Sequence, residues 1–381
     1  MREPRVGFFC FINYQDRRVF SGTLYYMRQA LAARKEMQIV DLGNPSPPSF
    51  WEKVQKRIRK LTHTEKPKIG SPRYQAKYKK FVEQVQQQLR KTPCDIIFAP
   101  AASEELSFFS TDLPIIYLSD TTFKLFNQGY EVNFEPQEIE WRDRQEATAI
   151  SKARQLIYPS GWAANSAIED YQADPAKIKI IPFGANLEDP PAASDALSRK
   201  LASPCRLLFV GRNWYRKGGE IAFQTLSHLC QMGVDAELVV VGTTPPEDMT
   251  HDKVQVIPYL NKNEPQQRQQ LEQLFLTSHF FIFPTRADCS PIVVCEASAY
   301  GLPILTTEVG GIPTIVENGK NGYMLSLSAS GEEYAKLIAE IVSDSTRYNQ
   351  LVHSSRQEYD NRLNWERWAE SFSEIVMNMA H

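Results

Sequence analysis

Two carboxylates eight positions apart, Asp288 and Glu296, are the residues of this chain whose spacing best suggests chemistry. The apolar run at 280–283 stops at Pro284 and predicts a buried strand, and the segment after Pro291 predicts a helix. Asp288 then lies in the connecting loop and Glu296 within the helix. Carboxylates near free backbone N–H groups at a helix start are suited to holding sugar hydroxyls, so the spacing indicates a sugar nucleotide.

The ordinary interpretation of such a pair is a helix cap at Asp288 and a surface residue at Glu296. The neighbours of Glu296 argue against it, because a solvated charge would be out of place among small apolar side chains. Those neighbours are Val293, Val294, Ala297 and Ala299.

A basic turn precedes the acidic pair along the chain. An apolar strand predicted at 206–210 leads into Gly211, Arg212 and Lys217, and a helical pattern follows. Unpaired N–H groups and the helix dipole both favour negative charge at such a junction, so a diphosphate fits there. Taken alone this motif is equally a solvated basic turn, but its place ahead of the acidic pair favours the anion site.

The two segments resemble the nucleotide-sugar signature of the retaining family 4 glycosyltransferases (group 1 type), in which two acids eight positions apart precede Gly-Leu-Pro. Asp288 stands where that family usually has Glu. The resemblance implies that Asp288 lies beside the donor sugar, that Glu296 binds the ribose, and that Arg212 and Lys217 neutralise the diphosphate. The donor-binding residues it implies are Gly22, Gly211, Arg212, Lys217, Cys289, Ser290, Pro291, Ile292 and Glu296.

The resemblance also implies the reaction. A sugar passes with retention from a nucleotide-diphosphate sugar to a hydroxyl acceptor such as a glycan, a lipid or a small molecule, with UDP-sugar favoured and GDP-sugar next. The cations replace a metal ion and no other cofactor is expected. Asp120 follows a predicted strand at 115–118, where the family usually carries His, and we assign it to the catalytic residues as a contact for the sugar or the acceptor.

Strands and helices alternate in two series, which indicates an α/β protein with parallel sheets. The family has the GT-B fold, two Rossmann-like domains facing across a cleft. We expect an acceptor-side domain at 1–188, a linker at 189–204, a donor domain at 205–362, and a C-terminal helix at 363–381 that packs back on the first domain. In the first domain, Ser21 or Thr23 is expected to cap a helix, and Gly22 to let the backbone approach the donor phosphate.

Composition indicates a globular protein of the cytoplasm. The chain has 381 residues, 42% of them hydrophobic and 23% charged, and no uninterrupted apolar run of the ~20 residues that span a bilayer. Its six cysteines lack metal-binding spacing and are expected to be reduced core residues.

A basic segment stands apart from this pattern. Residues 51–80 hold eleven Lys and Arg against two Glu, a net charge of +9 in a chain whose total is −2. We expect a basic helical insertion at about 45–91. One interpretation is peripheral contact with an anionic membrane at its inner face, and the preferred one is a solvated insertion packed on the first domain. No nucleic-acid module accompanies the basic run, so nucleic acid is not expected as a partner.

Two other functions remain open from the sequence. A nucleotide-sugar epimerase or hydrolase on the same fold would keep the nucleotide contacts, and a non-catalytic nucleotide-sugar binding protein would bind the donor without turnover. A dehydrogenase is disfavoured because no Gly-x-Gly-x-x-Gly follows the first strand.

Overall fold

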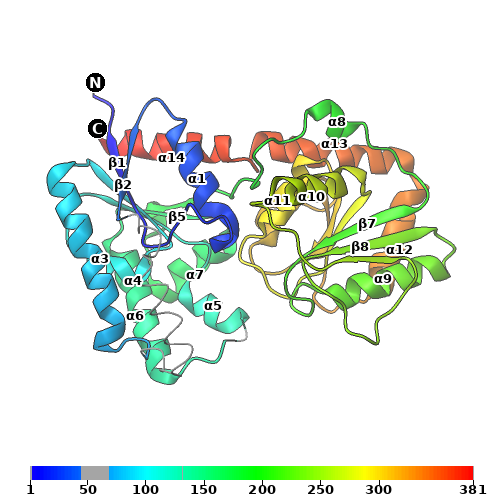
Figure 1. Cartoon of the computed structure of the whole chain (residues 1–381), viewed down its shortest axis with the longest axis horizontal. Coiled ribbons are helices and arrows are strands. Elements are labelled where there is room, and N and C mark those ends of the chain that lie inside the picture. Colours follow the sequence, from blue (N-terminus) through cyan, green and yellow to red (C-terminus); the bar gives the residue numbers. More distant parts are fainter. Residues whose placement is uncertain (1, 44–67, 131, 381) are drawn as a thin grey trace. The chain divides into compact units, whose positions relative to one another are not determined.

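The chain divides into two compact units, each built on a parallel sheet. The structure is a computed structural model and describes residues 2–43, 68–130 and 132–380. One unit runs to Ile181 and takes in the chain again from Ala369, and the other is Pro182–Trp368. Helices cover both faces of the sheet in each unit (Figure 1), which confirms the predicted α/β class.

In the described residues the first unit contains a six-stranded parallel sheet in the order β2-β1-β3-β4-β5-β6. Its strands are β1 Arg5–Phe9, β2 Gln38–Leu42, β3 Ile96–Pro100, β4 Ile115–Leu118, β5 Gln155–Tyr158 and β6 Ile178–Ile180. Its helices are α1 Thr23–Ala32, α3 Pro72–Lys91, α4 Ser103–Leu106, α5 Phe123–Gly129, α6 Pro136–Lys152, α7 Gly161–Tyr171 and most of α14 Trp365–Ala380.

In its described part, the basic segment packs on the first unit through helix α3, as the preferred interpretation predicts. Helix α3 joins β2 to β3, and its residues Phe81, Val82 and Val85 are buried in the core beneath the sheet. The helix is therefore part of the crossover of a βαβ unit, and its cations are exposed. The rest of the expected insertion, including most of the basic run at 51–80, lies outside the described residues.

The start of α1 also differs from expectation. Neither Ser21 nor Thr23 caps the helix: the N-cap is Gly22, with φ +84°, and no side chain hydrogen-bonds to the helix end there. A Cβ on Gly22 would lie 3.1 Å from the carbonyl oxygen of Arg17, so this tight entry requires glycine.

The second unit repeats the architecture with a six-stranded parallel sheet, within the described residues, in the order β12-β11-β10-β7-β8-β9. Its strands are β7 Cys205–Val210, β8 Ala236–Val241, β9 Val254–Ile257, β10 Phe280–Phe283, β11 Ile304–Thr307 and β12 Gly322–Leu325. Its helices are α8 Ala193–Leu197, α9 Gly219–Gln231, α10 Pro265–Thr277, α11 Ile292–Ala299, α12 Gly331–Ser343 and α13 Ser345–Asn361.

Each face of the second sheet has its own apolar core, because successive side chains of a strand point to opposite faces. Leu208 of β7 packs with α10 and α11, whereas Leu207 and Phe209 pack with α9 and α12. Burial on both faces explains why these strands are continuous apolar runs in the sequence.

The boundaries of the second unit extend beyond the expected donor domain. The backbone N–H of Ala185 donates to the carbonyl oxygen of Leu363 (2.9 Å), and Trp365 Nε1–H donates to Asn186 Oδ1 (2.8 Å). Residues 182–188 and the first turn of α14 therefore belong to this unit. From Ala369 onward α14 belongs to the first unit, where Phe372 packs on Phe98 with ring centroids 4.6 Å apart.

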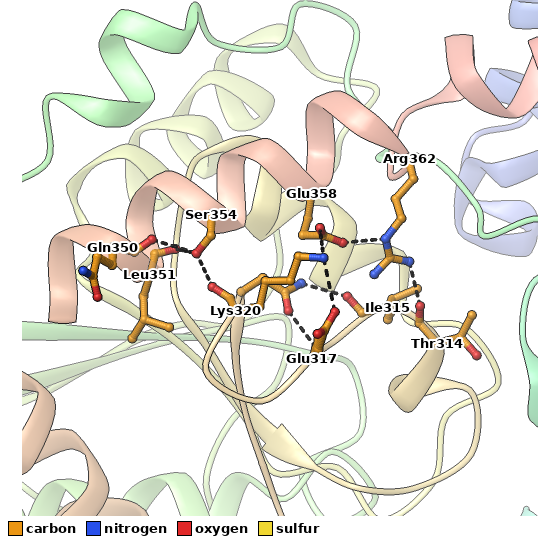
Figure 2. Close-up of polar contacts among 10 residues, drawn as sticks. Thr314, Ile315, Glu317, Lys320, Gln350, Leu351, Ser354, Glu358 and Arg362 are labelled. Atoms are coloured by element: carbon orange, nitrogen blue, oxygen red, sulfur yellow. Dashed lines mark hydrogen bonds and ion pairs between the residues drawn. The ribbon is translucent and has the colours of Figure 1, made fainter.

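A buried acid ties α13 to the loop between β11 and β12 (Figure 2). Glu358 is 3% exposed, and its carboxylate accepts hydrogen bonds from Lys320 Nζ (2.8 Å) and Arg362 Nε (2.5 Å). Lys320 also reaches Glu317 (3.2 Å), and Arg362 donates to the Thr314 carbonyl oxygen (2.7 Å). Burial acts to raise the pKa of Glu358, but the hydrogen bonds from the two cations outweigh it and hold that pKa below its usual range.

Replacing Glu358 with Gln is expected to lower the free energy of unfolding by about 1–3 kcal/mol at pH 7, since the amide leaves Arg362 without an anion and leaves Lys320 with Glu317 alone. Because the folded-state pKa of Glu358 is lowered, its contribution is present above the unfolded pKa and is lost as pH falls through the folded value. The gap between wild type and E358Q should therefore shrink from pH 7 toward pH 3 in urea titrations.

Glu332→Gln is the matched control, because Glu332 pairs with Lys336 (2.7 Å) on an exposed helix face. The free energy of unfolding of this variant should be close to that of wild type. An E358Q protein as stable as E332Q at pH 7 would contradict the structural role of the buried acid.

Candidate active site

The candidate site lies at the carboxyl edge of the second sheet, where the strand order reverses. β7 and β10 are parallel neighbours, and from them the chain runs outward to β8 and β9 on one side and to β11 and β12 on the other. Loops 211–218 and 284–291 leave the carboxyl ends of these two strands and meet there. Open parallel sheets bind ligands at this kind of switch point.

The loop after β7 is a tight turn that fits against the loop after β10. Gly218 adopts φ +75° as the N-cap of α9, and a Cβ at that position would lie 1.8 Å from the Pro284 carbonyl oxygen. The Arg216 carbonyl oxygen accepts hydrogen bonds from Thr285 Oγ1 (3.0 Å) and from the Arg286 N–H (2.8 Å). The two loops therefore form one packed surface.

Lys217 and Asp288 form an ion pair across these loops, between Nζ and Oδ2. Their side chains are only 13% and 11% exposed, so both charges are largely removed from water. Burial lowers the pKa of Lys217, although Asp288 acts in the opposite direction. Two predicted site residues that are 71 positions apart are thus in direct contact.

The backbone of Asp288 is held by the loop after β11. The Gly311 N–H donates to the Asp288 carbonyl oxygen (3.0 Å), and a Cβ on Gly310 would lie 2.1 Å from that same oxygen. The Gly310–Gly311 pair is therefore a close approach of backbone to backbone that fixes the acidic loop.

Arg212 lies on the same loop as Lys217 but is exposed and contacts Tyr259. Its guanidinium carbon is 5.3 Å from the Tyr259 ring centroid, and Nη2 is 3.5 Å from the phenolic oxygen. In the described part of the chain it forms no ion pair. Its charge therefore faces solvent and is available to an anion.

Glu296 lies within α11, as the sequence predicts, and is only 1% exposed. Lys262, in the loop between β9 and α10, donates from Nζ to Glu296 Oε1 (2.5 Å). Burial raises the pKa of Glu296, and the Lys262 charge partly offsets that effect. The acid borders a pocket whose other lining residues are Asn186, Leu187, Lys262, Arg268, Leu271, Glu272 and Phe275.

Between the two acids, the chain passes through the remaining donor-site residues. Cys289 is buried, and all six cysteines are free thiols, as predicted. Ser290 Oγ is buried without a hydrogen-bond partner in the described part of the chain, and Pro291 is the N-cap of α11, so no side chain caps that helix. The Val294 N–H donates to the Pro291 carbonyl oxygen (2.9 Å), whereas the N–H groups of Ile292 and Val293 have no partner within the helix and are suitable for a ligand.

Gly22 and Asp120 belong to the first unit. Gly22 forms the entry to α1 beyond β1, and Asp120 follows the carboxyl end of β4. Near Asp120, burial raises the pKa of Glu146 to about 8, and the charge of Asp120 adds to this effect. Glu146 accepts a hydrogen bond from the Tyr117 hydroxyl (3.1 Å).

Lys262 is the site residue that the sequence analysis missed. Motif spacing gives no sign of it, since it lies 34 positions before its partner Glu296 in an irregular loop. Its position does carry a signal, because it follows β9 at the same carboxyl edge as the other site residues.

Comparison with known proteins supports a glycosyltransferase. Residues 204–344 match the family model described as glycosyl transferases group 1. The chain is 24% identical over 287 residues to a D-inositol 3-phosphate glycosyltransferase from Xylanimonas cellulosilytica. The matched stretch covers 69% of this chain and 66% of that protein. The matched stretches span about half to two thirds of the length of such curated relatives.

Solved structures extend the likeness to the whole chain. Sucrose-phosphate synthase from Thermosynechococcus elongatus superposes with a TM-score of 0.69 and 16% identity, covering 99% of both chains. HepE from Anabaena, solved in complex with UDP-glucose, gives a TM-score of 0.66 and 15% identity over 98% of this chain and 100% of that one. The chain has the GT-B fold, as predicted.

The described residues contain neither a membrane-spanning helix nor a cluster of metal-binding side chains. No helix there is both long enough and apolar enough to span a bilayer. Nor do three or more His, Cys, Asp or Glu side chains gather there in a way that would hold a metal ion.

Gly218→Ala is expected to destabilise the second unit and to disrupt the site, because the new Cβ meets the Pro284 carbonyl oxygen. In urea titrations, Gly218→Ala should lower the free energy of unfolding by about 2 kcal/mol more than Gly233→Ala does. Gly233 is the matched control, since its φ of +78° imposes the same left-handed strain but nothing lies within 4 Å of its Cβ. Equal losses in the two variants would mean that the two loops do not pack as described.

Proposed function

We propose that this chain is a retaining glycosyltransferase that moves a sugar from a nucleotide-diphosphate sugar to a hydroxyl acceptor. The observation that carries the proposal is the presence of two Lys–acid pairs at one sheet edge. Lys217–Asp288 lies where loops 211–218 and 284–291 meet, and Lys262–Glu296 borders the neighbouring pocket. The uncapped start of α11 separates the two acids. Such a surface suits a ligand with a diphosphate at one end and a diol at the other.

In this proposal Arg212 and Lys217 hold the donor diphosphate. Arg212 is exposed and carries no ion pair in the described part of the chain, and Lys217 is held in place by Asp288. As the bond from the anomeric carbon to the phosphate oxygen breaks, its electron pair passes to the diphosphate. The two cations stabilise that charge better than water does, because their positions are fixed beforehand.

Asp288 and the N–H groups near Ser290 orient the sugar, with Cys289, Pro291 and Ile292 forming the chain beneath it. The acceptor oxygen bonds to the anomeric carbon from the face that the nucleotide leaves, which gives retention, and its proton passes to the departing diphosphate. The nucleophile comes from the acceptor, so no enzyme nucleophile is assigned. Two residues of the first unit complete the proposal. Asp120 is proposed to contact the sugar or the acceptor, and Gly22 is proposed to let the backbone approach the donor phosphate.

UDP-sugar is the favoured donor and GDP-sugar the next. The fold of HepE, which binds UDP-glucose, supports this order. The reaction is proposed to need no metal ion. Arg212 and Lys217 supply the positive charge that a metal ion would otherwise provide to neutralise the diphosphate. A location in the cytoplasm, with peripheral contact to an anionic membrane through residues 51–80, stays a prediction.

Lys217→Ala and Glu296→Ala are each expected to lower sugar transfer by roughly a hundredfold or more, since each removes a charge that contacts the donor. The assay follows transfer from UDP-glucose, and from GDP-mannose if the first is inert, to a mixture of hydroxyl acceptors, with product anomers read by NMR. Wild-type activity should persist in EDTA, and the product should keep the donor's anomeric configuration.

Lys253→Ala is the control, because Lys253 pairs with Asp235 (2.9 Å) on an exposed part of the same unit. It should transfer sugar normally. Release of free sugar alone would point to a hydrolase, and donor binding without turnover would point to a binding protein. Normal transfer by both K217A and E296A would overturn the site assignment.

A further inference from the structure

Glu296 is a fully buried acid with a single counterion. It is 1% exposed, and Lys262 Nζ reaches its Oε1 (2.5 Å) from the loop after β9, with the lysine side chain 34% exposed. No donor in the described part of the chain reaches Oε2. The carboxylate therefore has one oxygen engaged by the ammonium and one oxygen available on a residue that lines the pocket.

The other charged groups of the pocket do not neutralise Glu296. Arg268 is turned to two other acids, Glu188 (2.7 Å) and Glu272 (3.8 Å). The rest of the lining is apolar apart from Asn186, with Leu187, Leu271 and Phe275 in the wall. A carboxylate in such surroundings takes up a proton unless a cation stands beside it, so the charge of Glu296 depends on Lys262.

We propose that Lys262 is a positioning residue for the nucleotide: it keeps Glu296 ionised and leaves Oε2 as the acceptor for the ribose hydroxyls. This inference rests on the proposed function, since it assumes that a nucleotide diphosphate occupies this edge of the sheet. An ionised carboxylate accepts hydrogen bonds about twice as strong as those of a neutral acid. A protonated Glu296 would also lose acceptor capacity. Lys262 therefore governs affinity for the nucleotide through the charge state of its partner.

Titration calorimetry with UDP tests this on the full chain, using GDP if UDP does not bind. Lys262→Met keeps the length of the side chain but removes the charge. It should weaken binding roughly ten- to hundredfold at pH 7. Without the lysine the pKa of Glu296 rises further, so a larger fraction of the acid is protonated, and that fraction falls as pH increases. The ratio of mutant to wild-type Kd should therefore fall between pH 7 and pH 9. Changes in the charge of UDP itself cancel in this ratio, because both proteins bind the same ligand.

Three further variants separate this role from a structural one. Lys262→Arg keeps the charge and should bind UDP within a fewfold of wild type. Glu296→Gln should bind UDP weakly, and the ratio of its Kd to that of wild type should not change with pH. Lys253→Met, which removes a lysine from the exposed Asp235 pair, should bind normally. Thermal unfolding of each variant shows that the fold is retained.

The outcomes distinguish the inference from the function on which it rests. If wild type binds UDP but K262M binds it equally well, or binds it weakly with no pH dependence, the role of Lys262 is wrong and the proposed function stands. If wild type binds neither UDP nor GDP at millimolar concentration, the proposed function fails and the inference falls with it.

Discussion

The close packing of two loops at the carboxyl ends of β7 and β10 is the constraint on which the candidate site depends. Gly218 lies so near the Pro284 carbonyl oxygen that no side chain fits between them. This contact places Lys217 against Asp288, and the Gly310–Gly311 backbone supports Asp288 from the next strand. The site is thus built from loops fixed by backbone contacts, which lets charged side chains keep their positions before a ligand arrives.

Each of the two acids is matched by one lysine, and the two pairs differ in a way that suits two tasks. Lys217 and Asp288 are similarly shielded, so both charges are held in place beside the exposed Arg212. Glu296 is fully buried while Lys262 is partly exposed, so the acid depends on a partner that can exchange contacts with solvent or a ligand. A diphosphate needs fixed positive charge, whereas a diol needs an ionised acceptor with a free oxygen.

Much of the second unit could be predicted from its sequence, because strands buried on both faces are read as apolar runs. The strand Phe280–Phe283 was predictable for this reason. The helix that carries Glu296 and the loop that carries Asp288 were predictable from the residues that follow this strand. Lys262 was not predictable, since its partner Glu296 is distant in sequence and only the folded sheet brings the loop after β9 to α11. The contact between Lys217 and Asp288 was not predictable for the same reason, because these two residues are also distant in sequence.

The first unit was harder to predict where local signals compete. Ser21 and Thr23 are good capping residues, yet the backbone turns through Gly22 with a left-handed φ that leaves neither side chain in a capping position. The many cations of α3 left contact with an anionic membrane open as an alternative, whereas its apolar stripe, including Phe81 and Val85, joins the core, as the preferred interpretation predicted. Charge on an exposed face does not reveal what the opposite face covers.

A crystal structure of the full chain with bound UDP is the most direct test of the account. The ribose hydroxyls should lie within hydrogen-bonding distance of Glu296, with Lys262 still beside that acid, and the diphosphate should contact Arg212 and Lys217. A nucleotide bound away from this sheet edge, or one whose ribose does not touch Glu296, would contradict the central claim that the two lysine–acid pairs form the donor site.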